Sequence, residues 1–83
     1  MAVRVVGIDV GKETLAIAVH PTGESWTSAT TEAAIAALVV RLEVLSPDVV
    51  VMEATGGYEL PVAAACAAGG LPVAIVNPRQ VRA

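Results

Sequence analysis

The sequence predicts an α/β domain built on a mixed sheet, with the element order β-β-β-α-β-α-β. Three observations lead to this prediction. Several short runs rich in valine, isoleucine and alanine have the length and composition of strands. Two later segments have helical patterns, one with apolar side chains at helical spacing and one made mostly of alanine. Strands that alternate with helices are typical of crossover units, which place helices on the faces of a sheet.

The first strand is predicted over residues 3–10, which are apolar and rich in β-branched side chains apart from Arg4 and Asp9. Such a run is typical of a central strand buried on both faces. Residues 11–13 form a turn, and residues 15–20 form a second apolar run, so the pair predicts an antiparallel hairpin.

A third strand is predicted over residues 25–29, after a turn over residues 21–24 that contains proline and glycine. Its alternation is weak and Trp26 is its one large side chain, which favours a polar edge strand. We expect Trp26 to act in packing.

The first helix follows a cap at Thr30 or Thr31, with Glu32 favourable in its first turn. It ends at residues 46–47, because the residue before a proline avoids helical geometry. Its buried stripe is predicted to contain Ile35, Leu38, Val39, Leu42 and Leu45.

The next strand covers residues 49–52 and ends at Glu53, and a flexible loop over residues 54–57 follows it. The second helix is expected to begin near Gly57 or Tyr58, with Pro61 in its first turn, where a missing N–H does least harm. The Gly-Gly pair at residues 69–70 ends this helix, and residues 72–76 form a last short strand.

Composition limits the size and setting of the domain. The chain has 83 residues, which allows one small domain at most. Hydrophobic residues make up 55% and charged residues only 16%, so we expect part of the surface to be covered by another domain or by a second copy in a homo-oligomer. The net charge of −3 argues against a stand-alone nucleic-acid binder.

The cellular setting follows from the cysteine count and from the apolar runs. Cys66 is the single cysteine and cannot form an internal disulfide, which fits a reducing cytoplasm and a small core residue. We expect neither a signal peptide nor a membrane span, since charged residues, glycines and prolines interrupt the apolar runs. His20 has no cluster of ligating side chains that would predict a zinc site.

Two acidic residues are the main candidates for chemistry. Asp9 and Glu53 each end an apolar run, an expensive place for a charge without a partner. Right-handed crossovers would make their two strands parallel neighbours, with both acids at the carboxyl edge of the sheet. Carboxylate oxygens select Mg²⁺ or Mn²⁺. A second interpretation stays open, in which Asp9 caps the turn at Gly11 and Glu53 caps the next helix.

Three segments of the chain form a recognisable set. They are Gly7-Ile8-Asp9-Val10-Gly11-Lys12, Met52-Glu53-Ala54-Thr55-Gly56-Gly57-Tyr58 and Val76-Asn77-Pro78-Arg79-Gln80-Val81-Arg82. In this order and spacing they resemble the N-terminal part of the DEDD transposases, an insertion-sequence family with a RuvC-like domain that is associated with bridge-RNA-guided recombination. The resemblance covers essentially the whole chain, and the second and third segments are the more specific ones.

The resemblance implies a ribonuclease-H-like fold in which Asp9 and Glu53 are the first two catalytic, metal-binding acids of a tetrad. The family's other two acids lie in a downstream Asp-x-x-Asp element, and a further domain carries a nucleophilic serine; neither occurs in these 83 residues. We therefore expect a single, partial RuvC-like domain over residues 1–83, inactive alone, whose full-length form uses DNA and a guide RNA.

Six residues are weaker candidates for nucleic-acid contacts, either through positive charge or through backbone N–H groups at a helix start. Each has a plainer interpretation as a solvated cation or as part of a tight turn. The six are Lys12, Thr55, Gly56, Gly57, Arg79 and Arg82.

Two alternative functions compete with the transposase interpretation. The first is the N-terminal lobe of a sugar-kinase/actin-like ATPase, whose first phosphate loop also follows an Asp-x-Gly turn; it lacks support from a second glycine-rich loop. The second is a non-catalytic truncated domain that only oligomerises with intact transposase, which the low charge content favours.

Overall fold

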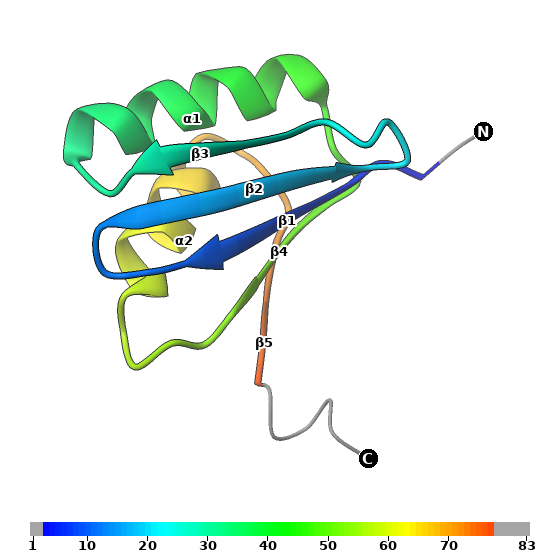
Figure 1. Ribbon diagram of the computed structural model, residues 1–83. Helices are drawn as coiled ribbons and strands as arrows, with labels where there is room; N and C mark the ends of the chain where they lie inside the picture. Colours follow the sequence, from blue (N-terminus) through cyan, green and yellow to red (C-terminus); the bar gives the residue numbers. More distant parts are fainter. Residues whose placement is uncertain (1–2, 78–83) are drawn as a thin grey trace.

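A computed structural model describes residues 3–77 as one five-stranded sheet with two α-helices (Figure 1). The element order is the predicted β-β-β-α-β-α-β. Differences from the predicted bounds amount to one or two residues at the ends of elements. The elements are β1 (Val5–Val10), β2 (Thr14–His20), β3 (Ser25–Ala29), α1 (Glu32–Leu45), β4 (Val49–Glu53), α2 (Glu59–Ala68) and β5 (Val73–Val76).

The strands lie in the order β3-β2-β1-β4-β5, so β1 is central. It pairs antiparallel with β2 and parallel with β4, while β5 adds to β4 in parallel. The expected meander followed by two crossover units is confirmed. A parallel pair needs a long crossover connection, and α1 and α2 supply the two that this sheet requires.

Both helices pack on the same face of the sheet (Figure 1), where one hydrophobic core joins them to the strands. The expected stripe of α1 is confirmed: four of its members are buried, and Leu45 packs against the core. From α2, Val62, Ala63 and Cys66 enter the same core, and Cys66 is fully buried as expected. Trp26 packs against this core from the edge strand, with the Arg41 guanidinium 3.6 Å from the centre of its ring.

The opposite face of the sheet is not covered by any helix of the described residues (Figure 1). The expectation that β1 is buried on both faces is therefore wrong. Val6, Ile8 and Val10 are buried, but Val5 and Gly7 are half-buried and Asp9 is exposed. The apolar composition of β1 reflects a face lined by small side chains, which α1 and α2 cannot reach because both connections cross on the other side.

Polar contacts fix the ends of α1. The side chain of Thr31 caps its start by accepting a hydrogen bond from the N–H of Ala34 at 3.2 Å. At its other end Ser46 has a left-handed backbone with φ of 53°. The Arg4 guanidinium donates to the carbonyl of Leu45, which ties the start of β1 to the end of α1.

A reciprocal pair of hydrogen bonds joins the beginnings of β1 and β4. The Arg4 N–H donates to Oδ2 of Asp48 at 2.6 Å, and the Asp48 N–H donates to the carbonyl of Arg4 at 2.8 Å. Arg4 precedes Asp9 by five residues and Asp48 precedes Glu53 by five. This pair of hydrogen bonds, the Arg4–Asp48 clamp, therefore supports the register that places Asp9 and Glu53 at the same level of the sheet.

Among the described residues, no helix is long and apolar enough to cross a membrane.

Candidate metal centre at the carboxyl ends of β1 and β4

Asp9 and Glu53 occupy matching positions on two neighbouring parallel strands. The last paired residues of β1 and β4 are Ile8 and Met52, and the next residue on each strand is the acid. Because side chains alternate along a strand, both acids project from the face that the helices leave uncovered. The predicted arrangement of the two strands and of their ends is thus observed.

A hollow of about 610 Å³ lies on this uncovered face and includes both acids. Its floor is formed by small side chains in a row across the sheet, at the level of Gly7. The acids lie in the next row, with Ala16 and Thr27 on one side and Val76 on the other. The floor row is Ser25, Ala18, Gly7 and Val51. The small side chains leave the acids accessible to a ligand that approaches this face.

Both acidic residues are exposed, and within residues 3–77 neither carboxylate forms a hydrogen bond or an ion pair. Each charge was expected to need a partner because it ends an apolar run, but both acids are exposed, since the strand ends open onto the uncovered face. The capping interpretation also fails. The turn at Gly11 is closed by a backbone hydrogen bond from the Gly11 N–H to the carbonyl of Thr14 at 2.9 Å, and not by Asp9. Glu53 does not cap α2, because that helix begins at Glu59, six residues later.

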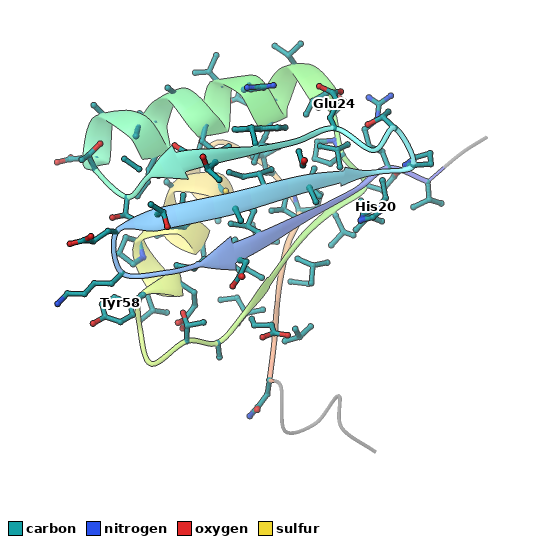
Figure 2. The ribbon with its side chains drawn as sticks, viewed as in Figure 1. His20, Glu24 and Tyr58 are labelled. Atoms are coloured by element: carbon teal, nitrogen blue, oxygen red, sulfur yellow. The ribbon has the colours of Figure 1, made fainter. Side chains whose placement is uncertain are left out.

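Two carboxylates are all that the described residues bring together here: residues 3–77 contain no group of three or more potential metal ligands. His20 and Tyr58 lie at opposite ends of the sheet (Figure 2), so the histidine is remote from the loop that follows Glu53. Mg²⁺ is commonly held by one or two carboxylates together with water and phosphate oxygens. The two exposed acids fit the protein's share of such a site.

The loop between Glu53 and α2 is closed by Glu59. Among the described residues, Glu59 is the one charged residue that is buried, with 6% of its surface exposed. Its Oε1 accepts hydrogen bonds from the Thr55 N–H at 2.8 Å, the Gly57 N–H at 3.0 Å and the Thr55 hydroxyl at 3.2 Å.

These bonds also decide how Glu59 titrates. The backbone N–H of Thr55 contributes most to lowering the pKa of Glu59 below its ordinary value of 4.5; the N–H groups of Glu59 itself and of Gly57 and the Thr55 hydroxyl add to the effect. Burial acts in the opposite direction and is outweighed, because the hydrogen bonds favour the charged form. The carboxylate is thus charged at neutral pH.

The structure places the candidate nucleic-acid contacts in different settings. The N–H groups of Thr55 and Gly57 already bind the Glu59 carboxylate, so a phosphate would have to displace it. Lys12 and Gly57 line a second, smaller hollow of about 190 Å³ between the β1–β2 turn and the start of α2. Gly56, between Thr55 and Gly57 in the sequence, is exposed with φ of 70°. Arg79 and Arg82 lie outside the described residues.

Glu59 was not among the residues that the sequence predicted to matter. The available signal was its spacing: an acid two residues after the Gly-Gly pair and four after Thr55, at the start of a helix. Acids are common in first helical turns for electrostatic reasons alone. Nothing in the spacing distinguishes that ordinary role from a carboxylate turned back into the loop.

Comparison with known proteins identifies a family and a fold. A family model described as a transposase, of the DEDD type of IS110 elements, matches residues 6–83. Among solved structures, T. thermophilus RuvC in complex with a Holliday junction substrate is similar, with a TM-score of 0.71 and 20% identity. The match covers 98% of this chain and 68% of that one, and confirms the ribonuclease-H-like (RuvC-like) fold. A search of curated proteins found no match.

Proposed function

The chain belongs to the DEDD transposase family, and from this premise we propose that residues 1–83 form the N-terminal part of a RuvC-like catalytic domain that acts in DNA transposition. Membership of this family decides against the alternative of a sugar-kinase/actin-like ATPase lobe. DNA is the proposed partner, in line with the Holliday junction bound to the similar RuvC structure. A guide RNA and a homo-oligomeric state complete the proposal for the full-length protein.

The observation that carries the proposal is the pair of exposed acids at matching ends of β1 and β4. Asp9 and Glu53 are the proposed catalytic residues and would hold Mg²⁺ or Mn²⁺ through their carboxylate oxygens. When bound, such an ion activates water and stabilises the leaving oxygen of a phosphodiester. The small side chains of the hollow leave room for a nucleic-acid backbone to reach the two acids.

Two acids give an incomplete tetrad. The Asp-x-x-Asp element of the family does not occur in these 83 residues, so we propose that they are inactive alone. In the full-length protein the uncovered sheet face is where a downstream element would supply the remaining aspartates, because Asp9 and Glu53 both project from that face. Lys12 and Gly56 remain proposed contacts to nucleic acid, as do Arg79 and Arg82, which lie outside the described residues.

Metal binding tests the proposed site directly. In an NMR titration with Mn²⁺, the amide signals nearest Asp9 and Glu53 should broaden first, and Asp9→Asn or Glu53→Gln should weaken the effect by about tenfold or more. Asp48→Asn is the matched control, since it removes a carboxylate from the opposite end of the same strand. Broadening centred elsewhere, or unchanged by both site variants, would refute the assignment.

Recombination tests the function itself. In a full-length transposase that contains this domain, Asp9→Ala or Glu53→Ala should abolish recombination. Circular dichroism should show that both variants keep the fold, because both side chains are exposed and lack hydrogen-bond partners within residues 3–77. Normal recombination by either folded variant would contradict a catalytic role for that acid.

A further inference from the structure

We propose that Glu59 is a positioning residue for the metal site, which it serves by fixing the loop over residues 54–58 and thereby the backbone from which Glu53 projects. The proposal deepens the proposed function and rests on it. Glu59 does not touch the metal or the nucleic acid in this scheme. It acts through Glu53, which lies six residues before it in the sequence.

The contacts of Glu59 differ from those of an ordinary acid in a first helical turn. One oxygen, Oε1, accepts all three hydrogen bonds from Thr55 and Gly57. The side chain is buried, whereas Glu32, the acid in the first turn of α1, is exposed and makes no such contact among the described residues. A buried carboxylate with three donors is stable only while the loop keeps its conformation, so the two hold each other in place.

The loop needs such a restraint because of its two consecutive glycines. Gly56 has φ of 70° and Gly57 has φ of 107°, both in the left-handed region that glycine adopts without strain. The same freedom gives a glycine pair many alternative conformations. Thr55 and Gly57, on either side of Gly56, both donate hydrogen bonds to the Glu59 carboxylate, and these bonds hold the glycine pair in one conformation.

The position of Glu53 depends on this restraint because its side chain has no contact partner of its own. Its carboxylate is exposed and forms no hydrogen bond within residues 3–77, so only the backbone decides where it lies. The Ala54 N–H donates to the carbonyl of Val76 at 2.9 Å, which within residues 3–77 is the last hydrogen bond from this strand to the sheet. The next N–H, that of Thr55, is the one that Glu59 binds.

Without Glu59, the bond from Ala54 to Val76 would be the last hydrogen bond that holds residues 54–56 within the described part of the chain. The end of β4 could then fray, as strand ends do when their final bonds have nothing behind them. A metal ion shared between two strands requires both carboxylates at a fixed separation, and a small displacement of one weakens binding. Asp9 is less exposed to this effect, because the pairing of β1 with β2 continues past it to Val10 and Leu15 and is closed by the hydrogen bond from the Gly11 N–H to the Thr14 carbonyl.

The test combines Mn²⁺ titration with amide hydrogen exchange, both followed by NMR on the whole chain. Glu59→Ala should speed exchange at Thr55 and Gly57 and weaken Mn²⁺ binding at Asp9 and Glu53 by about tenfold, the low end of the effect of residues that orient metal ligands. Glu59→Gln should stay close to wild type in both measurements, because its amide oxygen still accepts from both N–H groups. Glu32→Ala is the matched control for loss of one negative charge at a helix start.

The proposal requires exchange at Thr55 and Mn²⁺ affinity to change together in Glu59→Ala. Faster exchange at Thr55 with wild-type Mn²⁺ affinity in Glu59→Ala would overturn the proposal, since the loop would then be loosened without consequence for the metal. If Glu59→Ala does not fold, Glu59→Asp, which keeps the charge but falls short of the loop, takes its place with the same criteria. If wild-type protein shows no Mn²⁺ effect at Asp9 or Glu53, the proposed metal site itself fails, and this role of Glu59 fails with it.

Discussion

The substitution Gly69→Ala tests how tightly the end of α2 packs against α1. An added Cβ at Gly69 would lie 2.7 Å from Cγ1 of Val39 and 3.1 Å from Oε1 of Glu43. The Glu43 side chain is exposed and can move away. Val39 cannot, because it is buried in the core and its branched side chain has one strongly preferred rotamer in a helix.

The expected loss of stability follows from two opposing effects. Forcing an extra methyl group into a packed contact costs about 1–3 kcal/mol. Replacing glycine where the backbone suits alanine, as φ of −81° does here, returns about 0.4–1 kcal/mol by restricting the unfolded chain. We expect a net loss of about 1.5 kcal/mol, which lowers Tm by roughly 6–12 °C in a domain of this size.

Gly7→Ala is the matched control, since it is the same chemical change in the same protein. No atom lies within 4 Å of an added Cβ at Gly7, on the uncovered face of β1. We expect this variant to be more stable than wild type by about 0.4–1 kcal/mol. Urea unfolding followed by the fluorescence of Trp26, the single tryptophan, measures both changes.

A double-mutant cycle identifies the cause of the loss. In a Val39→Ala background the clashing methyl group is gone, so Gly69→Ala should become neutral or slightly stabilising, with a coupling energy of about 1–3 kcal/mol. The reasoning is refuted if Gly69→Ala is as stable as wild type, or if its effect is unchanged when Val39 is alanine.

Two further predictions concern polar contacts. Asp48→Ala should destabilise the protein by about 1 kcal/mol in urea unfolding, because the Arg4 N–H loses its acceptor. Asp48→Asn keeps an acceptor oxygen and should lose less than half of this stability. Equal losses in the two variants would exclude a stabilising role for the Arg4–Asp48 hydrogen bond. Because its hydrogen bonds lower the pKa of Glu59, the stability that they provide is complete above pH 4.5 and is lost as the pH falls through the folded-state pKa. Unfolding midpoints between pH 6 and pH 3 should therefore fall more steeply for wild type than for Glu59→Gln, and parallel pH curves would contradict this.

Much of the fold was predictable because the strong signals in this chain are local. The stripe from Ile35 to Leu45 defines α1, and the branched apolar runs define β1 and β4, since each pattern reflects one element's own periodicity. The hand of crossover connections then made β1 and β4 parallel neighbours, which placed Asp9 and Glu53 at one edge.

Two sequence-based errors have a common physical origin. An apolar run such as β1 predicts burial on both faces, and a charge at its end is then expected to need a partner. The structure leaves one face uncovered and both acids exposed. Both crossovers run in the same direction across the sheet, so right-handed connections place α1 and α2 on one face. The pattern of a single strand carries no information about that placement.

The sequence by itself determined the elements, their order and the two acids that the sheet brings level, because periodicity, turn chemistry and crossover handedness are properties of neighbouring residues. Only the tertiary structure decided that the acids open onto an uncovered face and that Glu59 turns back to bind Thr55 and Gly57. It also decided that a methyl group is tolerated at Gly7 and not at Gly69. These outcomes depend on which surfaces meet in space, and that is fixed only when the whole core has packed.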